Sequence, residues 1–250
     1  MKKFTLEPMF INSLLIYAFC VGVLHTFAET YYTFSIINPI PKNLVAIVNG
    51  YVTICVGVII SEKHVLVRKE CLTDWNSKST KLKIGAGNTV RGYDWYQQFV
   101  NISQINDFTY DLSIVLLNHT IKLNEQVQVA QLPTQDVHTK KNAIVSGWTG
   151  KCSNDFKFFV NRKLMVVHYY PKECGEKKDD EFCGRTKYPK KSHSTKDDGI
   201  DRVYKISEGA PMIDSNGVLI GYTRFGCKEG GPVVNIYRHV NTIRNIIENP

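Results

Sequence analysis

Short apolar runs separated by turn residues recur through most of the chain, and they are rich in valine, isoleucine and leucine. Each run fits a short β-strand, and valine and isoleucine favour strands. The runs lie at residues 45–48, 54–60, 64–67, 82–84, 112–117, 143–145, 164–167 and 218–220. Their length and spacing predict an all-β protein, built as a barrel or a sandwich.

Only the C-terminus has a helical pattern. Val240, Ile243, Ile246 and Ile247 recur at steps of three and four residues and form one apolar stripe. We therefore expect a C-terminal helix that packs on the rest of the protein through this stripe.

The first residues have the pattern of a secretory signal peptide. Lysines near the start precede a mostly apolar run at residues 9–28, which ends with the small residue Ala28. A membrane anchor is the alternative, but Asn12 and His25 interrupt the unbroken apolar stretch that a membrane span prefers. We expect removal of residues 1–28 and secretion of the remaining chain, without membrane association afterwards.

Composition and charge narrow the class of protein. Hydrophobic residues make up 43% of the chain and charged residues 22%. These values are ordinary for a globular protein, and they exclude a disordered, collagen-like or coiled-coil chain. The formal net charge of +8 favours acidic partners without identifying one. Nothing in the pattern requires a nucleic-acid partner.

Cysteines and glycosylation sequons agree with secretion. Cys20 lies in the signal segment, and the cysteines that remain are even in number, which indicates disulfides in a secreted chain. They are Cys55, Cys71, Cys152, Cys174, Cys183 and Cys227. The sequons at Asn101 and Asn118 matter only in the secretory route, and the alternative for each is an unmodified surface asparagine.

A polar and basic segment extends from residue 183 to residue 206, and its composition predicts a loop or a long insertion rather than a core element. A solvated surface loop is the simpler interpretation. A binding site is the alternative, because functional residues concentrate on loops, and polyanion binding would explain the charge. The candidate binding residues are Arg185, Lys187, Lys190, Lys191 and Lys196.

The order of several segments resembles the trypsin-like (chymotrypsin-fold) serine peptidases. The matching segments are Cys55 to Ser61 followed by His64 and Cys71, Asp111 to Leu117, Val145-Ser-Gly-Trp148, Cys174 with Cys183, Gly209-Ala-Pro211, Gly221 to Gly226, and Ile236-Tyr237 with the terminal helix. The resemblance implies two packed six-stranded antiparallel β-barrels, at about residues 36–135 and 136–250, within a single domain at residues 29–250.

The family's mechanism requires a serine oxygen, an imidazole that accepts its proton, and a carboxylate that orients the imidazole. Asp111 matches the carboxylate. Glu70 stands before Cys71 where the family has its histidine, and Glu208 stands where it has its serine. A glutamate supplies neither group, so the resemblance implies an inactive homologue rather than an enzyme.

Other positions of the family's substrate pocket also differ. Ile206 replaces a glycine whose backbone N–H helps to form the oxyanion hole, and Ser207 replaces the aspartate that pairs with a new N-terminus on activation. Arg224 stands where a small serine lines the substrate groove. Asn235 falls near the pocket, and Arg202 or Asp201 falls near its base. We expect these side chains to obstruct a peptide.

The family's disulfide pattern pairs Cys55 with Cys71 and Cys174 with Cys183. Cys152 and Cys227 are left, and their loops flank the same pocket in the resembled fold. We therefore predict a Cys152–Cys227 bridge across the pocket entrance.

The three carboxylates at the catalytic positions are expected to converge. They could raise one another's pKa or hold a cation. The alternative is that the neighbouring basic residues Arg68, Lys69 or Arg224 pair with them. We favour pairing, and we expect neither a metal nor a cofactor.

Residues 121–133 and 142–148, with glutamate at both catalytic positions, most resemble the scabies-mite inactivated protease paralogues, which are related to the mite group 3 trypsin allergens. This resemblance implies secreted, non-proteolytic binding of host serum proteins, including complement recognition components. The alternative is an endogenous secreted pseudoenzyme, acting as an inhibitor decoy or as a reproductive-tract type of homologue. A decoy needs an open cleft, which the obstructed pocket disfavours.

Overall fold

The computed structural model describes residues 41–50, 52–72, 82–87, 97–136, 143–152, 158–173, 175, 178–187, 204–206, 209–224 and 230–249, with backbone alone for residues 52, 148–152, 158–167, 187 and 204–206. All of them belong to one compact unit, Ile40–Pro250. The predicted signal peptide lies outside the described residues. Within the described ranges, no helix is both long and apolar enough to span a membrane.

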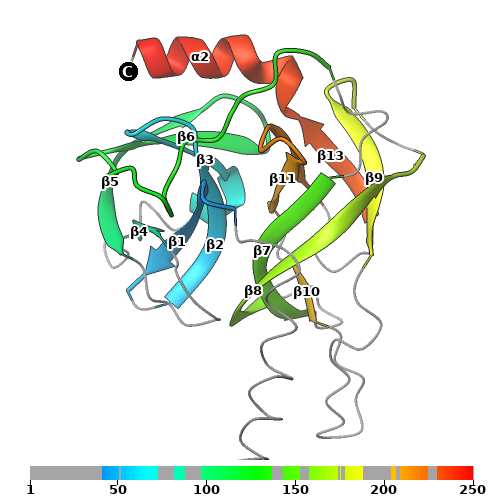
Figure 1. Cartoon of the computed structure of the whole chain (residues 1–250), viewed down its shortest axis with the longest axis horizontal. Coiled ribbons are helices and arrows are strands. Elements are labelled where there is room, and N and C mark those ends of the chain that lie inside the picture. Colours follow the sequence, from blue (N-terminus) through cyan, green and yellow to red (C-terminus); the bar gives the residue numbers. More distant parts are fainter. Residues whose placement is uncertain are drawn as a thin grey trace, which may run out of the picture. The chain divides into compact units, whose positions relative to one another are not determined.

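The first barrel consists of β1 (Leu44–Asn49), β2 (Val52–Ile59), β3 (His64–Arg68), β4 (Leu82–Ala86), β5 (Gln98–Asp107) and β6 (Leu112–Leu117). These antiparallel strands close in the order β1–β2–β3–β6–β5–β4 (Figure 1). Closure leaves no strand edge unpaired. Runs of β-branched residues form these strands because such side chains pack well on a pleated surface.

The second barrel consists of β7 (Ala143–Cys152), β8 (Phe158–Pro171), β9 (Glu181–Lys187), β11 (Pro211–Asp214), β12 (Leu219–Thr223) and β13 (Gly230–Asn235). The strands follow the order β7–β11–β12–β13–β9–β8, and β8 pairs back with β7 to close the ring. The short strand β10 (Tyr204–Ile206) pairs with β7 outside this ring. The predicted fold of two six-stranded antiparallel barrels is confirmed.

Strand β1 packs on both barrels, which explains why its apolar run is continuous rather than alternating. Val45 and Ile47 belong to the core of the first barrel. Ala46 and its even-numbered neighbours pack instead with residues of the second barrel such as Met212 and Val233. The interface also contains a buried hydrogen bond of 2.7 Å, in which the Tyr222 hydroxyl donates to the carbonyl oxygen of Leu66. The two barrels therefore share an apolar core.

The C-terminal helix predicted from the apolar stripe is confirmed. It comprises a 3₁₀ turn, η2 (Ile236–His239), followed by α2 (Val240–Glu248). Val240 and Ile243 are buried in a cluster with residues of both barrels. The helix thus packs across the junction between the two barrels.

A loop was expected between residues 183 and 206, and this prediction is wrong for the first and last residues of the segment, which form strands. Residues up to Lys187 continue β9, which pairs with β13 on one side and β8 on the other, and β10 occupies the last three positions. Thr186 is buried whereas Arg185 is exposed. This alternation fits a barrel strand, and the basic composition concealed it.

The disulfide between Cys55 and Cys71 is present, as the resemblance implied. It ties β2 to a short 3₁₀ turn, η1 (Lys69–Leu72). Cys183 is also disulfide-bonded. Cys174, Cys227 and the side chain of Cys152 lie outside the described residues, so the other two predicted bridges stay predictions.

Candidate functional site

Asp111 precedes β6 at the junction of the two barrels, and its backbone is held from two sides. The Thr109 hydroxyl oxygen accepts hydrogen bonds from the backbone N–H groups of Asp111 and Leu112, at 3.2 and 2.8 Å. The N–H of Lys69 donates to the Asp111 carbonyl oxygen at 2.8 Å. This local frame fixes Asp111 against η1 and presents its carboxylate toward the second barrel.

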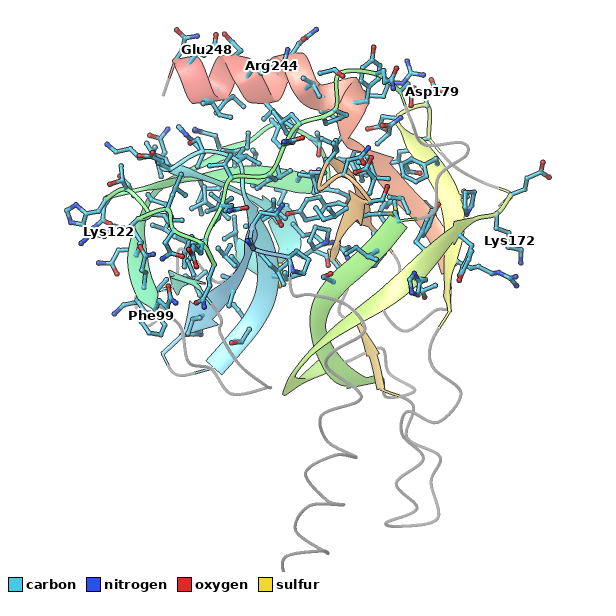
Figure 2. The ribbon with its side chains drawn as sticks, viewed as in Figure 1. Phe99, Lys122, Lys172, Asp179, Arg244 and Glu248 are labelled. Carbon is cyan, nitrogen blue, oxygen red and sulfur yellow. A yellow bond between two sulfur atoms is a disulfide. The ribbon has the colours of Figure 1, made fainter. Side chains whose placement is uncertain are left out.

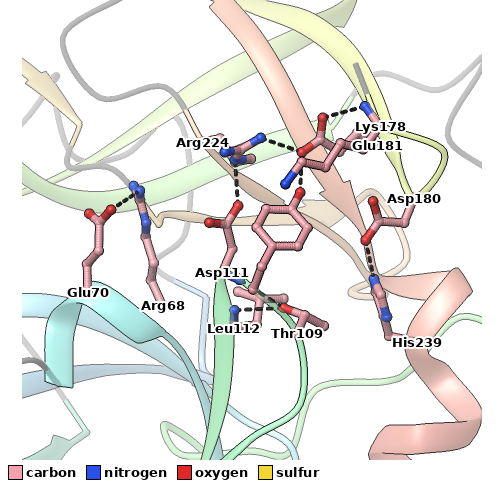
Figure 3. Close-up of polar contacts among 11 residues, drawn as sticks. Arg68, Glu70, Thr109, Asp111, Leu112, Lys178, Asp180, Glu181, Arg224 and His239 are labelled. Carbon is pink, nitrogen blue, oxygen red and sulfur yellow. Dashed lines mark hydrogen bonds and ion pairs between the residues drawn. The ribbon is translucent and has the colours of Figure 1, made fainter. Parts of the chain in front are cut away.

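Arg224, the residue after β12, binds this carboxylate and a second one. Its Nε lies 2.5 Å from Asp111 Oδ2, and its Nη1 lies 2.6 Å from Glu181 Oε1 (Figure 3). Asp111 belongs to the first barrel and Glu181, at the start of β9, to the second. One guanidinium group therefore bridges a carboxylate from each barrel.

Glu181 is the most deeply buried member of this network, with a side chain that is only 1% exposed. Its carboxylate also accepts a hydrogen bond from the Tyr110 hydroxyl and one of 2.9 Å from the backbone N–H of Lys178. The Lys178 ammonium group lies over the Tyr110 ring, a cation–π arrangement. We name the five residues Tyr110, Asp111, Lys178, Glu181 and Arg224 the interbarrel network.

The two carboxylates of the interbarrel network respond differently to their surroundings. Burial raises the pKa of Asp111, and the nearby cations, Arg224 and Arg68 foremost, only partly offset this. Burial also acts to raise the pKa of Glu181, but the hydrogen bonds from Tyr110, the Lys178 backbone and Arg224 outweigh it and lower that pKa. Glu181 is therefore the carboxylate that the network holds most firmly in its charged form.

Glu70 lies in η1, directly before the disulfide-bonded Cys71. Its side chain is 67% exposed, and its Oε1 is 2.9 Å from Nη2 of the largely buried Arg68. The Arg68 stem packs against Gly209, whose φ of +73° suits glycine and where an added Cβ would come within 2.8 Å of Arg68 Cβ. Arg68 therefore fills the space beneath the start of β11.

The expected pairing of carboxylates with basic neighbours is confirmed for Glu70 with Arg68 and for Asp111 with Arg224. Lys69 instead pairs with Asp107, at 2.5 Å. Among the described residues, no group of three or more His, Cys, Asp or Glu side chains is arranged to hold a metal ion. Chemically, the arrangement is a charge-compensated ion network.

Asn235 is buried at the end of β13. Its side-chain oxygen accepts a hydrogen bond from the Tyr237 N–H, which caps η2, and its amide nitrogen donates to Asp136 at 3.2 Å. Ile206 is described by its backbone alone, which pairs with Thr149 in the ladder between β10 and β7. Ser207, Glu208, Arg202, Lys190, Lys191 and Lys196 lie outside the described residues.

Sequence reasoning missed Glu181, Tyr110 and Lys178. A local signal was available for Glu181, because this acidic residue directly precedes the apolar Phe182 and Cys183 in the sequence. Tyr110 directly precedes Asp111, but its bonded partner Glu181 is 71 residues away along the chain. A contact of that range has no local signature.

Comparison with known proteins finds one matching family and two similar solved structures. The model of the family described as trypsin matches residues 42–247. A solved structure of kallikrein-related peptidase 10 is similar at 17% identity, covering 84% of this chain and 97% of that one, with a TM-score of 0.55. A mutant of human heparin binding protein is similar at 18% identity, covering 85% and 95%, with a TM-score of 0.60. At these identities the two structures support the fold alone.

Proposed function

The chain belongs to the trypsin family, and from that premise we propose that it is a secreted, proteolytically inactive homologue that acts by binding other proteins. The ion pair between Arg224 and Asp111 carries the proposal. A trypsin-type mechanism needs the aspartate carboxylate to accept a hydrogen bond from an imidazole and to stabilise the imidazolium. Here an arginine holds that carboxylate and anchors it to Glu181 as well.

Glu70 supports the same proposal. It occupies the sequence position of the family's histidine, and its carboxylate is paired with Arg68. A carboxylate has no ring nitrogen that could take the proton of a serine hydroxyl and return it to the leaving group, as the imidazole does in the family's mechanism. With Glu208 at the serine position, the chain also lacks the nucleophilic hydroxyl.

Restoring two residues is not expected to restore activity. The variant Glu70→His/Glu208→Ser should not cleave a fluorogenic peptide, because Arg224 would still hold Asp111 and because Ile206 and Ser207 remain. The measurement is kcat/KM, with active trypsin added to a parallel sample to validate the assay. Turnover by the unmodified chain would contradict inactivity. Turnover by the double variant would contradict the assigned role of Arg224, and adding Arg224→Ser tests that role directly.

The resemblance to the scabies-mite inactivated paralogues supports host complement as the target. A suitable surface is the outer face of β8 and β9. In the ladder between these two strands, Tyr170 lies opposite the exposed Arg185, and His168 lies opposite position 187. In the sequence β9 is followed by the basic segment, and acidic surfaces of serum proteins would match the positive charge of Arg185.

Purified chain should inhibit complement deposition in human serum in a dose-dependent manner, whereas a lysine-matched control protein should not. The variant Arg185→Glu should weaken the inhibition several-fold. Arg244→Glu is the matched control, because Arg244 is an exposed arginine on α2. Equal weakening by both variants would argue against the β8–β9 face.

An absence of any inhibition would favour the endogenous pseudoenzyme, and a pull-down would then identify its partner. An inhibitor decoy is disfavoured by the Arg224 bridge between the barrels. Polyanion binding is a second candidate that the exposed Arg185 favours, and salt-dependent retention on a heparin column tests it. The similar human protein is named for heparin binding.

A further inference from the structure

Phe99, Asn101 and Ser103 share the outer face of β5. The residues between them, Val100 and Ile102, are buried in the core of the first barrel, as the two-residue alternation of a strand requires. Phe99 is 54% exposed, more than any other large hydrophobic side chain in the described part of the chain. It projects from the outside of the barrel (Figure 2). An aromatic ring therefore stands beside the asparagine of a sequon.

The second sequon directly follows the neighbouring strand, β6. The N–H of Asn118 donates to the carbonyl oxygen of Asn101 at 3.1 Å, and both asparagines are exposed. Two residues before Asn118 stands Leu116, which is half-buried and not aromatic. The two sequons therefore share one surface but differ in this flanking side chain, so Asn118 serves as an internal control.

We propose that Asn101 carries an N-glycan whose first sugar stacks on Phe99. The apolar C–H face of a sugar ring fits the negative face of an aromatic ring, and the contact removes apolar area of Phe99 from water. Residues two apart on a strand are neighbours on the same face, so the sugar can reach back to the ring. Phe99 is thus a positioning residue for the glycan.

The inference rests on the proposed secretion, because the glycan donor is a lipid-pyrophosphate-linked oligosaccharide of the secretory route. In the transfer, the amide nitrogen of Asn101 forms a bond to the anomeric carbon of the first sugar. The bond from that carbon to the pyrophosphate oxygen breaks, and the lipid pyrophosphate leaves with the bonding electrons. The amide loses one proton to a base of the transferase.

The test expresses the full chain in eukaryotic cells and measures site occupancy in the medium by glycopeptide mass spectrometry. We expect sugar at Asn101. In an Asn118→Gln background, enzymatic removal of the Asn101 glycan should lower Tm by about 2–4 °C. This loss should nearly vanish in Phe99→Ala and persist in Phe99→Trp. Tyr237→Ala, which removes another exposed aromatic side chain, is the matched control and should leave the loss unchanged.

The outcomes separate this inference from the proposed function. Glycan at Asn118 but not at Asn101 overturns the inference and leaves secretion supported. An equal Tm loss with and without Phe99 overturns the stacking. Absence of the protein from the medium, with neither sequon modified, overturns both the inference and the proposed secretion.

Discussion

Replacement of Arg224 by alanine is expected to lower the free energy of unfolding by about 3 kcal/mol, because it leaves Glu181 buried without its cation. The side chain of Glu181 is 1% exposed, so its charge is compensated by Arg224 and by hydrogen bonds rather than by bulk water. Asp111 loses its ion pair at the same time. For a chain of this size the loss corresponds to a fall in Tm of about 6–12 °C.

Arg244→Ala is the control for Arg224→Ala. Arg244 is exposed on α2, so its removal changes the net charge equally and should alter Tm little. Adding Glu181→Gln to Arg224→Ala should recover part of the stability, because the uncompensated buried charge is then gone. A Tm for Arg224→Ala equal to that of the control would contradict the bridging role of Arg224.

The pH dependence of stability distinguishes whether Arg224→Ala removes an ion pair or only packing. The network lowers the pKa of Glu181, so its contribution to stability is present above the ordinary carboxyl pKa of 4.5 and declines as pH falls through the lowered value. The stability difference between the parent chain and Arg224→Ala should therefore shrink over that acidic range. A difference that does not change with pH would indicate that Arg224 acts through packing alone.

The parts of the fold that could be predicted are those with local signatures. Runs such as residues 112–117 are apolar because they face a core, and the stripe of Val240 and Ile243 has helical spacing because one side of α2 is buried. The Cys55–Cys71 disulfide followed from the order of family segments. For the strands and the helix, nearby residues carried the information, whereas the disulfide required the family resemblance.

The pairing of Asp111 with Arg224 was predicted, but the rest of the interbarrel network could not be, because its partners are brought together only by the closed barrels. Arg224 is 43 residues from Glu181 along the chain, and their two strands are separated by β13 in the barrel. The sequence identified Arg224 as a bulky residue near a groove and as one possible partner of the carboxylates. The structure adds that the guanidinium group of Arg224 joins the two barrels by binding a carboxylate from each. Strand β9 was missed for a related reason, since its pairing with β8 and β13 outweighs the basic composition of its end.

Removal of the Cys55–Cys71 disulfide by the double substitution Cys55→Ala/Cys71→Ala is expected to cost about 3 kcal/mol. The bond spans 16 residues, and it restricts the unfolded chain by closing that loop. Chemical reduction is unsuitable for this test, because Cys183 is also disulfide-bonded and would be reduced as well. Denaturant unfolding measures both the free energy of unfolding and m, the slope with which that free energy falls as the denaturant concentration rises.

The slope identifies how the stability is lost. If the disulfide acts on the unfolded state, its removal lets the unfolded chain expose more surface, so m should rise while the midpoint falls. A lower midpoint with an unchanged m would place the effect in the folded state, where η1 carries Cys71 beside Glu70 and follows Arg68. An unchanged midpoint would contradict the prediction, because it would mean that the strands and cores hold η1 in place without the bond.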